Sequence, residues 1–167
     1  MSRASFFRHL GGKEEVVFAD HAALLARLDD FLRGTSLGVR EALEEAVLQV
    51  FRHHTADPDR ARARSRLLRG SQSLRTRELL TSHRYTELFS GWLATALPDT
   101  PARGGVAVGL AAAVVAVHNR ALRAWLHAPA DDAEAGLRAD LAEVIARLTA
   151  EPAEAERTLA AVRRLLG

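Results

Sequence analysis

The first thirteen residues combine hydroxyl, guanidinium, imidazole and ammonium groups within a short span. In a helix over about residues 2–10, the first side chains would present hydroxyls, a guanidinium and a methyl group to base edges in a DNA major groove. Lys13 opens the next helix, where backbone N–H groups and an ammonium favour a phosphate. The candidate DNA-contact residues are Ser2, Arg3, Ala4, Ser5, Phe7, Arg8, His9 and Lys13. The alternative is an ordinary amphipathic helix with solvated arginines.

The rest of the chain shows no comparable arrangement for catalysis or metal binding. Seven histidines are present, but none has a partner at a ligand spacing backed by carboxylates. The serines lie in no nucleophile motif, and no glycine-rich phosphate loop occurs. We therefore expect no enzymatic activity, no metal site and no cofactor.

Helices must position these groups, because no alternating strand pattern occurs and Ala, Leu, Arg and Glu dominate. Gly11-Gly12 separates the first helix from one over about residues 13–33, which Gly34 ends. Asp57-Pro58 and Thr100-Pro101 are each typical of an N-cap followed by proline at the first helical position. The other predicted helices cover about residues 37–55, 58–69, 73–97 (one long or two short), 102–127, 133–149 and 152–166. The fold class is therefore all-α.

Composition limits the class of protein. The 167 residues are 48% hydrophobic and 26% charged, which is typical of a soluble globular chain. The net charge is only +2, so nucleic-acid contact requires a local basic patch. The absence of cysteine fits a reducing compartment. Since no signal peptide is visible and the most apolar run, residues 104–117, is shorter than the roughly 20 residues of a membrane span, we expect a cytoplasmic protein without membrane contact.

The order Ser-Arg-Ala-Ser-Phe-Phe-Arg-His-Leu at residues 2–10 closely resembles the DNA-recognition helix of the tetracycline-repressor (TetR) family. The match continues without a gap through the turn and the segment Lys-Glu-Glu-Val-Val at residues 13–17. Later features are also similar: a basic stretch, an aromatic helix around residues 85–93, and a long alanine-rich helix ending in Arg-Ala-Trp-Leu. Two departures are Phe7, where the family usually has a tyrosine that donates to a phosphate, and Gly11-Gly12 in the turn.

The resemblance implies two parts. Residues 1–33 correspond to a helix-turn-helix domain that lacks its first two helices, and residues 35–167 to an effector-binding and dimerisation domain. Met1 stands where the family commonly has valine, so either an internal start or a short protein accounts for the missing helices. The implied function is a transcriptional regulator, a repressor released from its operator by a small hydrophobic effector. The alternative is a dimeric ligand-binding or interaction module that does not bind DNA itself.

The helical body holds the candidate effector site and dimer interface. The residues expected at the effector pocket are Phe51, Tyr85, Phe89, Trp92, His118 and Trp125. For each aromatic, the alternative is packing in the core without contact to a ligand. The helices at about 102–127 and 133–149 are expected to pair with their two-fold mates as a four-helix bundle, because the first is rich in alanine. Arginines between residues 60 and 84 either form a solvated surface or attract an anionic effector or a phosphate.

Overall fold

The structure is a computed structural model that describes residues 12–149, and these residues form six α-helices and no strand. In chain order the helices are α2 (Gly12–Gly34), α3 (Val39–Thr55), α4 (Pro58–Gly70), α5 (Gln72–Ala96), α6 (Arg103–His127) and α7 (Ala133–Thr149). The predicted all-α class is confirmed for this part of the chain. The helices predicted at about residues 2–10 and 152–166 lie outside the described residues.

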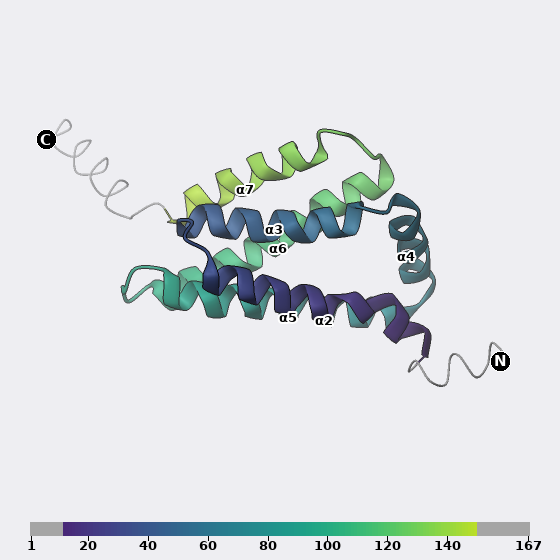
Figure 1. The fold of residues 1–167 in the computed structure, drawn as a ribbon, viewed down its shortest axis with the longest axis horizontal. Coiled ribbons are helices and arrows are strands. Elements are labelled where there is room, and N and C mark those ends of the chain that lie inside the picture. Colours follow the sequence, from purple (N-terminus) through teal and green to yellow (C-terminus); the bar gives the residue numbers. More distant parts are fainter. Residues whose placement is uncertain (1–11, 150–167) are drawn as a thin grey trace, which may run out of the picture.

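The long helices form a bundle in which α3 contacts α2, α6 and α7. Figure 1 shows α7 on one side of α3 and the pair α2 and α5 on the other. The short α4 lies across one end of the bundle and contacts α3, α5 and α6. Five helices therefore surround the volume near the α4 end, and each can place side chains there.

Helix α3 supplies much of the core because apolar side chains recur on more than one of its faces. Leu28 of α2, Leu93 of α5 and Leu141 of α7 are fully buried in the same cluster. A second, smaller cluster joins Phe18, Leu68 and Leu74, from α2, α4 and α5. The buried residues of α3 are Ala42, Leu43, Ala46, Val47, Leu48, Val50 and Phe51.

The ends of the helices test the local signals in the sequence. Asp57 caps α4 as predicted: the Arg60 N–H donates to its Oδ1 at 3.0 Å, and Pro58 opens the helix. Residues 72–96 form one long helix, which resolves the predicted choice. The Thr100 cap was wrong, because Ala102 is the N-cap of α6 and the Thr100 carbonyl instead accepts from the Arg103 N–H at 3.0 Å in a preceding turn.

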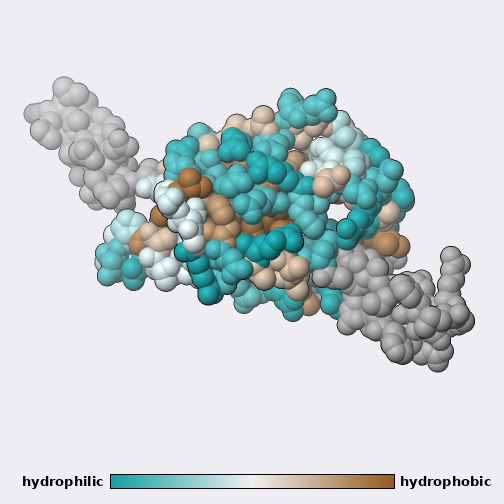
Figure 2. Space-filling view, in the orientation of Figure 1, coloured by the Kyte–Doolittle hydropathy of each residue, from teal (hydrophilic) through white to brown (hydrophobic). Residues whose placement is uncertain are grey.

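Helix α6 is the one described helix whose length and hydropathy would suffice to cross a membrane. It contacts α5, α7 and α3, although only 28% of its most apolar window is buried. Core helices of soluble proteins have the same length and hydropathy. In the view of Figure 2, hydrophilic residues cover most of the described surface, and hydrophobic residues show only in small patches.

Candidate functional site

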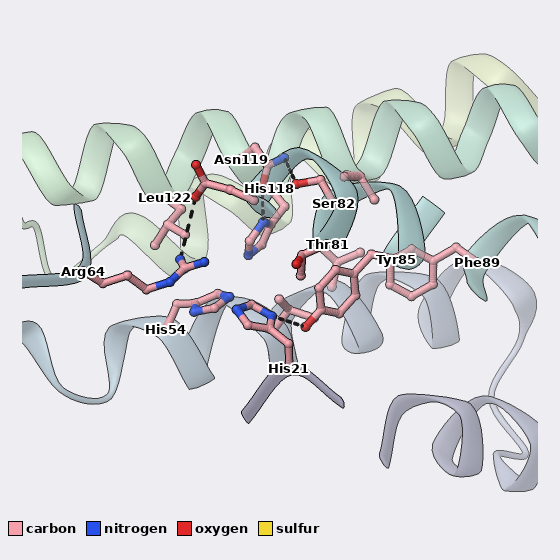
Figure 3. A pocket seen from close by; sticks show the side chains of 14 residues that line it. His21, His54, Arg64, Thr81, Ser82, Tyr85, Phe89, His118, Asn119 and Leu122 are labelled. Carbon is pink, nitrogen blue, oxygen red and sulfur yellow. Dashed lines mark hydrogen bonds and ion pairs between the residues drawn. The ribbon is translucent and has the colours of Figure 1, made fainter. Parts of the chain in front are cut away.

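A small cavity lined by both polar and apolar side chains lies between α2, α3, α4, α5 and α6 (Figure 3). Its free volume is about 40 Å³, which is enough for a few water-sized groups. Helical periodicity brings the lining together, since the lining residues of α5 recur every three or four positions along one face. The polar lining residues are His21, His54, Arg64, Glu78, Thr81, Ser82, Tyr85, His118 and Asn119, and the apolar ones are Val47, Val50, Phe89, Val115 and Leu122.

Three imidazoles from three helices meet at this cavity. The ring of His54 lies 5.2 Å from that of His21 and 6.0 Å from that of His118, measured between centroids. Burial lowers the pKa of His21 to about 4, that of His54 to about 2 and that of His118 to about 4. The nearby Arg64 guanidinium lowers the pKa of His21 and His54 further. All three rings are therefore neutral at pH 7.

A buried hydrogen bond joins α2 to α5 at the cavity. His21 Nδ1 and the Tyr85 hydroxyl are 2.9 Å apart, and both residues are only 6% exposed. Burial raises the pKa of the Tyr85 phenol and lowers that of the His21 imidazole, so the bond joins two neutral groups. The orientation of His21 therefore depends directly on a cavity residue of α5.

Arg64 brings a poorly compensated positive charge to the cavity. Its side chain is 19% exposed, and its nearest carboxylate, on Glu78, lies 3.8 Å away, beyond ordinary hydrogen-bond length. The guanidinium carbon sits 4.9 Å from the centre of the Phe18 ring, which offers a cation–π contact. Burial lowers the pKa of Arg64, and its Nε has no hydrogen-bond partner among the described residues.

His118 presents a second unsatisfied polar atom. The residue is 6% exposed, and its Nδ1 lies 3.1 Å from Asn119 Oδ1. Because an amide oxygen only accepts, Nδ1 carries the ring hydrogen and Nε2 carries a lone pair. In the described part of the chain Nε2 has no partner. Figure 3 shows Arg64 and the three imidazoles arranged around the same space.

A charged cluster beside the cavity ties α2, α3 and α4 together. His53 Nε2 and Arg60 Nη2 each lie 2.9 Å from Asp20 Oδ2. Burial by itself would raise the pKa of Asp20, but the hydrogen bond from His53 and the nearby His21 and Arg60 hold it below the ordinary value. Asp20 is therefore ionised at pH 7 and is balanced by Arg60.

A larger groove continues outward from the cavity. It has a free volume of about 690 Å³ and shares with the cavity the residues His54, Arg64, Glu78, Ser82, Asn119 and Leu122. Arg69, Arg75 and Arg123 also line it, and none of these three forms an ion pair with any described carboxylate. Glu78 is the sole carboxylate residue of the groove lining among residues 12–149. The groove is therefore electropositive.

The polar groups of the cavity and the groove can form hydrogen bonds and ion pairs with a bound molecule. Within residues 12–149, no three histidine or carboxylate side chains are placed to hold a metal ion. The cationic Arg64 beside the imidazoles would also repel one. The cavity offers the Arg64 guanidinium as a donor, the unpartnered His118 Nε2 as an acceptor, several hydroxyls and an apolar wall, and the groove adds further arginines.

The structure brings together half of the residues predicted for an effector pocket. Tyr85, Phe89 and His118 line the cavity. Phe51 is buried in the core, its ring 6.2 Å from that of His118. Trp92 and Trp125 pack, partly buried, against the main core.

Arg64 belongs to the arginines for which an anionic effector was one of the predicted alternatives. Other lining residues were not predicted: His21, His54, Glu78, Thr81 and Ser82. The sequence pattern of α5 could have predicted its lining residues, because polar residues recur at positions 78, 81, 82 and 85 on the face that also carries Phe89. Polar side chains on a core-facing stripe indicate either a buried network or a ligand site.

The predicted DNA-contact residues from Ser2 to His9 lie outside the described residues. Lys13 falls in the first turn of α2, as predicted. No family model, no curated protein and no solved structure matches this chain.

Proposed function

We propose that the chain is a ligand-responsive transcriptional regulator of the TetR type, in which a small molecule bound in the helical body changes the contact of residues 2–13 with DNA. The observation that carries this proposal is the reach of α2 into the cavity. Lys13 and His21 stand eight residues apart on α2, about 12 Å along a helix. His21 is held by Tyr85, so a ligand that displaces Tyr85 also moves α2.

The coupling needs no long pathway. A ligand in the cavity competes for the Tyr85 hydroxyl or pushes against the His21 ring, and α2 then shifts as a rigid element. Differential contacts of this kind are typically worth about 1–3 kcal/mol between two sites. A repressor of this design would leave its operator when the ligand binds.

A homodimer through α6 and α7 is part of the proposal. On α6, Gly105, Val108, Gly109, Ala112 and Ala116 are all exposed and fall on one stripe. A Cβ built on Gly105 or Gly109 would touch nothing within 4 Å, so the stripe is open for another helix. On α7, the small residues Ala135, Gly136 and Ala139 are also exposed. Two such faces can approach closely in a four-helix interface.

Ala112→Glu should convert the dimer to a monomer without unfolding it. Ala112 is exposed, so the new carboxylate costs the protomer little, while two-fold pairing of α6 would bury it uncompensated. Light scattering coupled to size-exclusion chromatography would show the mass halved. Ala22→Glu, at an exposed position of α2, serves as the matched control and should leave the mass unchanged. A dimer that survives Ala112→Glu contradicts this interface.

DNA binding should depend on the first thirteen residues. Arg3→Ala is expected to weaken binding to the preferred duplex by about 1–3 kcal/mol, because it removes a base-edge contact, and Lys13→Ala to weaken binding to all duplexes alike. Fluorescence anisotropy with duplexes from the DNA flanking the coding sequence would measure both. Arg147→Ala removes the same charge from α7, where the side chain is 77% exposed, and should have no effect.

A second candidate function is a dimeric ligand-binding module that does not bind DNA, and the location of the binding features favours it. The cavity, the groove and the α6 stripe are all built from residues 12–149. A dimeric ligand-binding module would therefore need none of the predicted DNA contacts. Ligand binding without affinity for any of the duplexes would assign the chain to this class.

A further inference from the structure

We infer that the cavity and its groove bind a small organic acid that carries both a carboxylate and a hydroxyl group, with the carboxylate on Arg64 and the hydroxyl on His118. The inference deepens the proposed function, on which it rests for the role of the acid as effector. It narrows the hydrophobic effector expected from the sequence to an amphipathic anion.

The surroundings of Arg64 favour a ligand that carries a carboxylate. A guanidinium is planar, always charged and suited to a bidentate carboxylate. Arg64 is largely buried, its Nε has no partner within the described chain, and Glu78 is 3.8 Å away with a side chain that is 43% exposed. A ligand carboxylate would supply the short, charge-assisted contact that Glu78 does not make.

The groove supports the same sign of charge. Arg69, Arg75 and Arg123 line it, and their hydrogen bonds, where they have them, go to neutral acceptors: Arg69 to the Ser65 hydroxyl and Arg75 to backbone carbonyls and Gln72. An electropositive groove with a low-dielectric wall attracts anions and raises their rate of association. An acid would therefore reach Arg64 from the groove side.

The tautomer of His118 favours a ligand that also carries a hydroxyl group. Its Nδ1–H donates to Asn119 Oδ1, so Nε2 offers a lone pair into the cavity and requires a donor. A carboxylate cannot donate, but a hydroxyl can. The small volume of the cavity admits a group of this size, while the carboxylate stays at the junction with the groove. Leu122 and His54, at the same junction, would contact the body of the ligand.

The test uses four probes that separate charge from hydroxyl. Isothermal titration calorimetry on the full chain would compare 3- and 4-hydroxybenzoate with benzoate, which lacks the hydroxyl, and with 3-hydroxybenzamide, which lacks the charge. At least one hydroxybenzoate is expected to bind about tenfold or more tightly than both analogues, because each removed contact leaves a buried polar group unpaired. If neither hydroxybenzoate exceeds its analogues, the inference is overturned.

Variants then assign the two contacts. Arg64→Gln should bring the hydroxybenzoate down to the affinity of the amide, and His118→Phe should bring it down to that of benzoate. Arg66→Gln is the matched control, since Arg66 lies exposed on α4 and lines neither the cavity nor the groove. Unchanged preferences in folded Arg64→Gln would overturn the assignment, and the wild-type comparison decides the ligand class even if a variant fails to fold.

The outcomes for ligand and function are separable. Acid binding without DNA binding would remove the proposed regulator but leave this inference standing. DNA binding without preference for the acids would do the reverse.

Discussion

Between pH 7 and pH 5 the free energy of unfolding should fall steeply, by about 2 kcal/mol for each of the three cavity imidazoles. His21, His54 and His118 have folded-state pKa values of about 4, 2 and 4, well below the ordinary 6.5. Below pH 6.5 these imidazoles bind protons in the unfolded chain but stay neutral in the folded chain. The stabilisation is therefore complete above pH 6.5 and is lost progressively as the pH falls, toward 4 for His21 and His118 and toward 2 for His54.

The groups facing these rings do not offset the loss. Arg64 opposes protonation of His21 and His54, while Asp20 favours it only for His21. A domain is typically stable by about 5–15 kcal/mol, so the combined loss is large enough to unfold this one near pH 5. Urea titrations followed by circular dichroism at pH 7, 6 and 5 would measure it.

Substitution assigns the effect to the cavity. His54→Leu removes one titrating ring and should reduce the pH dependence by about a third, since each ring contributes a similar slope. Arg66→Gln, at an exposed position of α4 outside the cavity, is the control for a substitution that removes no imidazole. A wild-type stability that changes by less than about 1 kcal/mol between pH 7 and pH 5 would show that these rings are not buried as neutral groups.

Replacing Arg64 by methionine should stabilise the empty protein while abolishing the preference for acids. Burial of the Arg64 charge costs desolvation energy, and its nearest described carboxylate, on Glu78, is 3.8 Å away. Replacing a buried ion pair by apolar side chains is often stabilising by about 1–4 kcal/mol. Arg64→Met leaves only the Glu78 carboxylate, whose side chain is 43% exposed and stays hydrated. Methionine keeps the length of the side chain and can contact the Phe18 ring in place of the cation–π interaction. We expect a gain of about 1–2 kcal/mol, smaller than the upper figure because that interaction is lost.

Differential scanning calorimetry at pH 7 would show this gain as a rise in Tm of about 2–4 °C per kcal/mol. Arg66→Met, at an exposed position of the same helix, should change stability by no more than about 0.5 kcal/mol. A fall in Tm for Arg64→Met would mean that the guanidinium holds the bundle together through Phe18 and Glu78. A rise would mean that the charge is kept at a cost to stability, as is common for binding groups.

Three imidazoles and a guanidinium line one cavity inside an otherwise apolar bundle. The imidazoles lower the free energy of unfolding in acid, and Arg64 lowers it at all pH values. Both nevertheless lie where a ligand can contact them. This is the pattern expected of a binding site, in contrast to a core that is packed for stability alone.

Local chemistry in the sequence determined the elements. Asp57-Pro58 predicted the start of α4 and Gly34 the end of α2, and the predicted bounds of α6 and α7, about 102–127 and 133–149, agree with the structure within one residue. These features depend on capping and periodicity over a few neighbouring residues, and both are visible in the sequence itself. The Thr100 cap predicted from Thr100-Pro101 was wrong because such local signals do not distinguish a helix start from a turn. The Thr100 carbonyl accepts from the Arg103 N–H in a turn, and α6 begins at Arg103.

The cavity was decided by the tertiary structure. His21, His54, Arg64 and His118 stand on four helices and up to 97 residues apart, the difference between positions 118 and 21. Their meeting depends on how each helix is rotated about its axis, and rotation is set by packing against partners distant in sequence. Spacing along the chain predicted no metal site for these histidines, and only His118 was expected at a ligand pocket. The sequence alone established that the protein is helical and where most of its helices begin and end; only the packing of those helices placed one cation and three neutral imidazoles around a common space.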